Sequence, residues 1–207
     1  MSKRKKRRKK YVKQSLGVLT AALLIGAAAA VIYGLTLISV NDPTETTSEN
    51  ETREELLYEE LVDAYSKEFS VPQNIIYAVM RVESVFDPDA LSYAGAMGLM
   101  QLVPSTFEWL CTFTGENADP ERLYDPETSI KYGTMFLSRL YKQYGDWTLV
   151  HAAYNAGQGN VNKWLKDERY SENGKLTSVP FAETRAYIEK VEYYKEHYKN
   201  IYDEKGW

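Results

Sequence analysis

The chain has 207 residues, enough for one medium-sized domain with appendages or for two small domains. Hydrophobic residues make up 44% and charged residues 26%, which excludes wholesale disorder, and a single cysteine, Cys111, excludes an internal disulfide framework and a multi-cysteine zinc site. The formal net charge of −4 combines two opposite parts, because residues 1–15 hold nine Lys or Arg and no acid, whereas the rest holds 16 basic and 29 acidic residues.

An apolar segment, residues 16–40, follows this basic tail. No charged side chain occurs between Lys13 and Asp42, and Leu, Ile, Val and Ala predominate. A helix over this segment extends roughly 37 Å at about 1.5 Å per residue, which spans the hydrocarbon core of a bilayer. Because hydrocarbon cannot solvate free backbone groups, such a segment is expected to be helical. The sequence therefore predicts a single N-terminal transmembrane helix.

The orientation of this helix follows from the charges beside it. The tail, residues 1–15, is expected on the cytoplasmic side, which places the C-terminal body on the outer face of the cell membrane. Two other interpretations of these segments exist. The tail could bind nucleic acid, but it directly adjoins the apolar segment, and no nucleic-acid partner is predicted. The segment could instead be a cleaved signal peptide, with Ala27–Ala30 as the small residues, but the apolar run continues beyond them.

Residues 41–53 have the composition of a short solvated linker, and the body, residues 54–207, shows helical signals throughout. Apolar residues recur at three- and four-residue steps from Leu57 to Phe69 and again after Pro72. Helix starts are indicated at Val103-Pro104-Ser105, at Asp125-Pro126-Glu127 and at Asp146, and a last helix is expected after Pro180. No stretch alternates like a strand for more than a few residues. The body is predicted to be a compact all-α domain.

Glu83 is the most informative residue of the body. It lies four residues after Val79, three after Met80 and seven after Ile76, so it falls on the apolar stripe of its helix. A charge there is costly to remove from water. The residue could be a glutamate at a helix end that turns into solvent or pairs with an arginine. It could also be a carboxylic acid whose pKa is raised by apolar surroundings, able to donate a proton near neutral pH.

Three further segments carry polar or small residues that packing alone does not explain. The first runs from Ser92 to Gln101 and contains two glycines, but no lysine of the phosphate-loop type follows it. The second, Ala153-Tyr154-Asn155-Ala156-Gly157, places an amide able to read a hydroxyl or acetamido group at a helix end. The third is Pro180–Tyr187, in which Glu183 could simply favour a helix start.

Taken together, Glu83-Ser84 and these three segments resemble the lytic transglycosylases of bacterial cell walls. They occur in the order and at the approximate spacing of the soluble-type (SLT) transglycosylase domain, over about residues 60–200. The resemblance implies a lysozyme-like helical fold for the body. It does not cover the tail, the apolar segment or the linker.

The resemblance also implies roles for individual residues. Glu83 matches the single catalytic acid of the family. The matching substrate-binding positions are Ser92, Gln101, Tyr154, Asn155 and Glu183. No metal and no cofactor is implied. Val103 departs from the family, which often has methionine there, and this puts one sugar contact in doubt but leaves the acid in place.

The implied reaction needs only one acid. Most glycosidases use two carboxylates, whereas here Glu83 would protonate the oxygen between N-acetylmuramic acid and N-acetylglucosamine. It would then accept the proton of the muramic C6 hydroxyl as a 1,6-anhydro ring closes. Two rival interpretations remain: a hydrolytic muramidase resembling goose-type lysozyme, and a non-catalytic wall-binding module. The expected partners are peptidoglycan strands and the cytoplasmic membrane, and the oligomeric state is left open.

Overall fold

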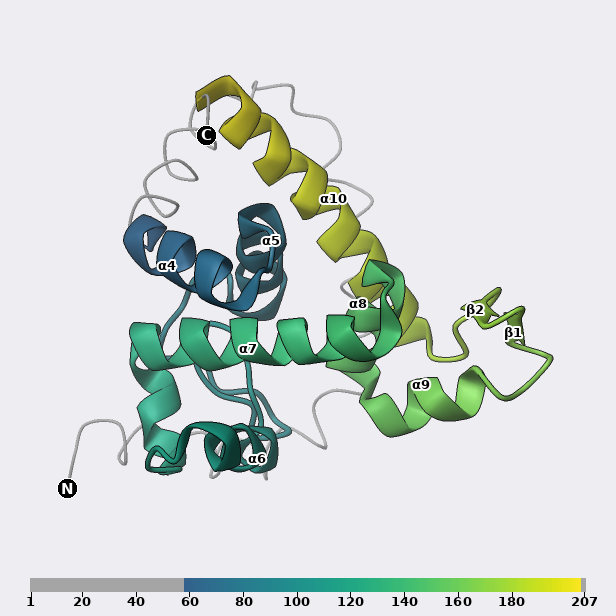
Figure 1. Cartoon of the computed structure of the whole chain (residues 1–207), viewed down its shortest axis with the longest axis horizontal. Helices are drawn as coiled ribbons and strands as arrows, with labels where there is room; N and C mark the ends of the chain where they lie inside the picture. Colours follow the sequence, from purple (N-terminus) through teal and green to yellow (C-terminus); the bar gives the residue numbers. More distant parts are fainter. Residues whose placement is uncertain (1–57, 206–207) are drawn as a thin grey trace, which may run out of the picture. The chain divides into compact units, whose positions relative to one another are not determined.

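The structure, a computed structural model, describes residues 58–205 (Figure 1). The predicted tail, transmembrane helix and linker lie outside the described residues. Among the helices of residues 58–205, none has the length and apolar character needed to cross a membrane.

Seven α-helices, one short 3-10 helix and one small hairpin make up the described part of the chain. The α-helices are α4 (Glu59–Phe69), α5 (Gln73–Ser84), α6 (Pro104–Thr114), α7 (Pro126–Tyr144), α8 (Trp147–Ala156), α9 (Gln158–Trp164) and α10 (Ala182–Lys205). The 3-10 helix is η1 (Pro120–Tyr124), and the antiparallel hairpin pairs β1 (Ser171–Glu172) with β2 (Lys175–Leu176). The prediction of a mainly helical body is confirmed.

The predicted helix boundaries are confirmed because local capping chemistry sets them. The Asp125 side chain accepts a hydrogen bond from the Thr128 N–H (2.9 Å) at the start of α7, and Asp146 accepts one from Leu149 (3.1 Å) at the start of α8. Gly115 and Gly145 adopt the left-handed conformation that ends α6 and α7.

Two local elements were not predicted. One is η1, where the Asp119 side chain accepts from the Glu121 N–H (3.2 Å) and so stabilises a single tight turn. The other is the β1–β2 hairpin, whose two-residue strands are too short to show an alternating pattern. Both lie between the helices, so neither changes the helical class.

The helices pack around α7, which crosses the middle of the domain in Figure 1. Helices α4 and α8 pack on α7, α9 packs on α8, and α10 packs on both α5 and α8. Large side chains fill the space between them with almost no exposure, among them Tyr77, Phe107, Tyr132 and Tyr198. One continuous hydrophobic core therefore joins elements from both ends of the described chain.

Polar contacts fix the position of α10 on this core. The Nδ1 atom of buried His151 on α8 lies 3.2 Å from Glu192 Oε1 on α10, and this contact together with Lys195 lowers the pKa of Glu192 to about 2. At the other side, the Asn74 amide of α5 donates to the Lys195 carbonyl (3.1 Å). These two polar contacts link α10 to α8 and to α5.

The segment between α5 and α6, residues 85–103, has no helix and follows a narrow course through the domain. Short bridges link Met97 to Leu91 and to Leu102. Gly98 has φ +75°, and a Cβ atom at this position would lie 1.8 Å from the Leu123 carbonyl oxygen. Gly95 has φ +83°, but no heavy atom lies within 4 Å of its virtual Cβ atom. Only Gly98 is required by close packing as well as by its backbone angle.

This contrast gives a matched pair of substitutions. We expect Gly95→Ala to lower the free energy of unfolding by about 1 kcal/mol, the cost of a left-handed alanine. Gly98→Ala adds a backbone collision and should cost about 3 kcal/mol or more. Urea denaturation followed by tryptophan fluorescence measures both, because all four tryptophans lie at or after Trp109. Equal losses for the two variants would contradict the packing argument.

Candidate active site

Glu83 lies in the last turn of α5, where the helix leaves the core. The helix buries Ile75 through Met80, and Glu83 itself is only partly exposed. Burial raises the pKa of its carboxyl group from 4.5 to about 7. Near neutral pH, Glu83 is therefore present in both its acid and its carboxylate form, as a group that first donates and then accepts a proton requires.

The turn that follows Glu83 is strained and firmly held. Val85 and Phe86 both have left-handed backbone angles (φ 54° and 60°), which is unusual for any residue other than glycine and costly for a β-branched one. The Ser84 hydroxyl donates to the Met80 carbonyl (3.1 Å) and contacts the Leu99 carbonyl (2.8 Å). Ser84 thus ties the end of α5, next to Glu83, to the glycine-containing segment.

Two tyrosines face the Glu83 carboxyl group, one from α8 and one from α10. The Tyr154 hydroxyl donates to the Met100 carbonyl (2.8 Å), and the Tyr187 hydroxyl is buried without a hydrogen bond of standard geometry. Tyr187 nevertheless lies close enough to Glu83 to offset part of the rise in its pKa. Burial raises the pKa of both phenols far above 10, and the charge of Glu83 raises them further. Both tyrosines therefore stay neutral beside the carboxylate.

No other Asp or Glu among the described residues contributes to the pKa shift of Glu83. Among the described residues, the pKa of Glu83 responds only to burial and to Tyr187, and to no other Asp or Glu. A pair of cooperating carboxylates within a few ångströms would couple their titrations. Among residues 58–205, the raised pKa of Glu83 therefore has burial as its cause and not the charge of a neighbouring carboxylate.

Gln101 holds the glycine-containing segment in shape. Its amide nitrogen donates to the carbonyls of Ala90 (3.1 Å) and Gly98 (2.9 Å), and its backbone is left-handed (φ 48°). These two bonds use the amide donors, so the amide oxygen is the group left for a ligand. The hydroxyl of Ser92 accepts the Ala96 N–H (2.9 Å) and closes a turn in the same segment. Ser92 makes no contact with Glu83 among the described interactions.

Asn155 and Glu183 occupy the junction between α8 and α10. The Asn155 amide oxygen accepts from the buried Thr184 hydroxyl (2.8 Å), so its amide nitrogen is the group that remains. Glu183, in the first turn of α10, has an exposed side chain and no contact with Glu83 among the described interactions. The structure therefore brings Tyr154 to Glu83 directly, whereas Asn155 and Glu183 lie beside this pair.

Tyr187 and Thr184 belong to the site but were not among the predicted site residues. Tyr187 is the residue through which α10 affects the pKa of Glu83, and Thr184 orients Asn155. The signal for both was their spacing from each other, since Thr184 and Tyr187 lie three residues apart and share one buried face of the helix, whereas Glu183 is exposed on another face.

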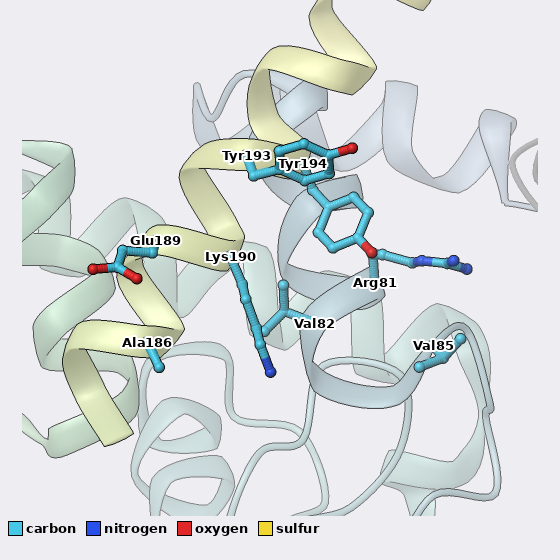
Figure 2. A pocket seen from close by; sticks show the side chains of 8 residues that line it. All are labelled: Arg81, Val82, Val85, Ala186, Glu189, Lys190, Tyr193 and Tyr194. Carbon is cyan, nitrogen blue, oxygen red and sulfur yellow. The ribbon is translucent and has the colours of Figure 1, made fainter. Parts of the chain in front are cut away.

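A groove of about 500 Å³ lies between the C-terminal end of α5 and α10 (Figure 2). It is lined by Arg81, Val82, Val85, Ala186, Glu189, Lys190, Tyr193 and Tyr194. Its members Val82 and Ala186 are the chain neighbours of Glu83 and Tyr187, yet neither Glu83 nor Tyr187 lines it. The one carboxylate in the groove, Glu189, is exposed. Chemistry rather than size therefore points to the surroundings of Glu83 as the reactive centre.

No three His, Cys, Asp or Glu side chains within residues 58–205 gather closely enough to hold a metal ion.

The matching protein family was identified by comparison with known proteins. The model of the family described as the transglycosylase SLT domain matches residues 60–176. The chain belongs to this family. The matched region includes Glu83 and Tyr154 and ends before the first turn of α10.

Relatives within the family are similar over most of this chain but are much longer. The soluble lytic murein transglycosylase of Escherichia coli (strain K12) is 36% identical over 161 residues, which is 75% of this chain and 25% of the relative. The membrane-bound lytic murein transglycosylase C of Haemophilus ducreyi is 32% identical over 168 residues, covering 70% of this chain and 46% of the relative. The chain thus spans about a quarter of the length of its soluble relatives.

Solved structures agree with the fold. The 70 kDa soluble lytic transglycosylase of Escherichia coli in complex with bulgecin A superposes with a TM-score of 0.66 at 36% identity, over 73% of this chain and 25% of that one. An inactive glutamate-to-glutamine mutant of the lytic transglycosylase Slt from Pseudomonas aeruginosa gives 0.64 at 34% identity, over 70% and 24%. The expected lysozyme-like helical SLT fold is confirmed.

The raised pKa of Glu83 predicts how stability depends on pH. Because the folded protein binds this proton more tightly than the unfolded chain, the proton stabilises the fold below about pH 4.5, and this contribution is lost as the pH rises through about 7. Glu83→Gln cannot ionise. At pH 8 we expect the free energy of unfolding of this variant to be about 2 kcal/mol higher than that of the wild type. At pH 4 we expect a smaller difference between the two.

Urea denaturation across this pH range tests the expectation, with Glu183→Gln as the control for loss of one exposed carboxyl group. A difference between Glu83→Gln and the wild type that does not change with pH would show that Glu83 is not held out of water.

Proposed function

We propose that this protein is a peptidoglycan lytic transglycosylase. It cleaves the β-1,4 bond between N-acetylmuramic acid and N-acetylglucosamine and leaves a 1,6-anhydro ring on the muramic residue. The observation that carries the proposal is the carboxyl group of Glu83, whose pKa burial raises to about 7 beside the Tyr187 hydroxyl. Membership of the SLT family and the names of the relatives support the same reaction.

The proposed reaction begins with Glu83 in its acid form. The carboxyl group donates its proton to the glycosidic oxygen, and the bond from that oxygen to muramic C1 breaks. The substrate's own acetamido group stabilises the cationic centre in place of a second carboxylate. Proton transfer of this kind is commonly worth about 10²–10⁴ in rate.

In the second step Glu83, now ionised, accepts the proton of the muramic C6 hydroxyl. The C6 oxygen closes onto C1, so one proton enters and one leaves the carboxyl group and no water is consumed. The nearby Tyr187 hydroxyl favours the carboxylate, since its contact with Glu83 lowers the pKa of that group. Burial alone favours the acid. The two effects together keep both forms accessible.

The remaining predicted residues are proposed to bind the sugars. The Gln101 amide oxygen and the Asn155 amide nitrogen are the polar groups left over after internal hydrogen bonding, and they suit a hydroxyl and an acetamido carbonyl respectively. Ser92 shapes the turn on the same segment, and Glu183 offers a carboxylate at the start of α10. Tyr154 contributes by fixing the Met100 carbonyl, next in the chain to Gln101.

The central test is Glu83→Gln. We expect it to reduce the release of anhydromuropeptides from purified cell wall by at least about 10²-fold while the circular dichroism spectrum is unchanged. Glu168→Gln, at an exposed glutamate in the segment 167–179, serves as the matched control and should keep wild-type activity. Surviving activity in the Glu83 variant would refute the assignment.

Mass spectrometry of the wild-type products separates the rival reactions. Anhydro products support the transglycosylase, products one water heavier with a reducing-end muramic acid indicate a hydrolytic muramidase, and wall binding without cleavage indicates a non-catalytic module.

We also propose where the enzyme acts. Residues 1–15 form a cytoplasmic tail, residues 16–40 a single transmembrane helix, residues 41–53 a linker, and residues 54–207 the catalytic domain outside the cell membrane. The run of uncharged apolar residues and the basic cluster before it support this arrangement. The existence of membrane-bound relatives is consistent with it. A flexible linker of this length reaches on the order of 20 Å, which favours glycan close to the membrane.

Protease added to intact protoplasts tests this topology. We expect the catalytic domain to be digested from outside, whereas a protein cut at the linker should leave a membrane-bound N-terminal fragment. Protection of the domain until the cells are lysed would invert the topology and contradict a wall enzyme.

A further inference from the structure

A second, smaller cavity of about 190 Å³ lies where α6, α7 and the start of α9 meet. Its lining consists of Trp109, Arg139, Lys142, Gln143 and Gln158. Two of these side chains are cationic, two are amides and one is aromatic, and none is acidic. The body of the protein, by contrast, carries 29 acidic residues against 16 basic ones after residue 15. A cavity with only positive charges is therefore unusual in this domain.

The cationic side chains of this cavity have no acidic partner. Among the described residues, neither Arg139 nor Lys142 forms an ion pair, and the buried Nε of Arg139 has no hydrogen-bond partner. The Arg139 guanidinium carbon lies 3.5 Å from the ring centre of Phe113 and 5.1 Å from that of Trp109. Stacking on these rings orients the planar guanidinium and leaves its N–H groups available to an oxyanion.

Aromatic contacts connect this cavity to the Glu83 site. The Trp109 ring centre lies 6.3 Å from that of Phe136, which lies 5.2 Å from that of Tyr154. The charge of Glu83 in turn raises the pKa of Tyr154. Gln158 follows Asn155 by three residues at the start of α9. The cavity is thus one aromatic side chain away from the proposed sugar-binding residues.

We propose that this cavity binds a carboxylate of the peptide stem that hangs from the glycan strand. The proposal rests on the function proposed above. The sugars of the strand are uncharged, whereas the stems carry free carboxylates at a distance from the cleaved bond. A guanidinium and an ammonium without internal partners match such a group. Stacking accounts for Arg139, and the Gln143 amide nitrogen donates to the Asn162 side-chain oxygen (3.4 Å). Neither contact accounts for Lys142, Gln158 or the cavity between them.

The test pairs neutralised enzyme with neutralised substrate. Full-length enzyme in detergent acts on wall fragments freed of phosphate polymers, with stem carboxylates either free or converted to neutral amides. We expect the wild type to lose about three- to tenfold in kcat/KM on the amidated wall. On the free-acid wall, Lys142→Gln and Arg139→Gln should have a kcat/KM already about three- to tenfold below that of the wild type. Amidation of the wall should lower the kcat/KM of these variants little further.

Controls separate charge from folding. Lys142 is exposed, so its variant stays folded even if loss of the Arg139 stack destabilises α7. Lys166→Gln, at an exposed lysine outside the cavity, should discriminate between the two walls as the wild type does.

Three results would overturn the inference. The first is a kcat/KM of the variants that is lower than that of the wild type by the same factor on both walls, which would show that the cations do not bind the carboxylates. The second is a wild-type kcat/KM that is the same on both walls. A penalty seen only on wall that keeps its phosphate polymers would identify phosphate as the ligand. If the wild type releases no anhydro product from either wall, the proposed function itself is overturned. If it releases anhydro product equally from both walls, only the proposed carboxylate site is overturned.

Discussion

The removal of one carboxyl group from water is the constraint on which the site depends. Glu83 lies in the last turn of α5, a helix that buries Ile75 through Met80, and tyrosines from α8 and α10 lie near its carboxyl group. The free-energy cost of removing the charged carboxylate from water appears as the rise in its pKa, and the packing of the long helices offsets this cost. Helix α10 contributes in two ways. Its contacts with the core hold the helix in place, and its residue Tyr187 stabilises the charged form of Glu83. The proton transfer proposed for Glu83 and the stability of the fold therefore place opposite demands on this position.

Met100 shows how an irregular segment becomes rigid enough to serve the site. Its N–H donates to the buried Ser129 hydroxyl (3.1 Å), and its carbonyl accepts from Tyr154 (2.8 Å). Its side chain fills a space that exists because residue 133 of α7 is glycine, since a Cβ atom there would lie 2.2 Å from the Met100 sulfur. A residue with no chemistry of its own thus connects α7, α8 and the segment that carries Gln101.

The sequence predicted the helices and the acid because their signals are local. The caps at Asp125 and Asp146 and the position of Glu83 on an apolar stripe can be read within a few residues. The order of the segments added the family and the roles that it implies. What escaped prediction depends on distant contacts. Tyr187 acts on Glu83 across more than a hundred residues of chain, and the stacking of Arg139 on Phe113 requires the packing of α6 on α7. No local pattern records either contact.

The position of α10 along the chain has a consequence for biosynthesis. Every other described element precedes it, yet it supplies Tyr187, the hydroxyl that orients Asn155 and the partner of His151. A nascent chain that has not yet released residues 182–205 has Glu83 but not the surroundings that tune it. The proposed activity would consequently arise only after translation has passed this helix. Vectorial synthesis would then delay the activity until the domain has folded.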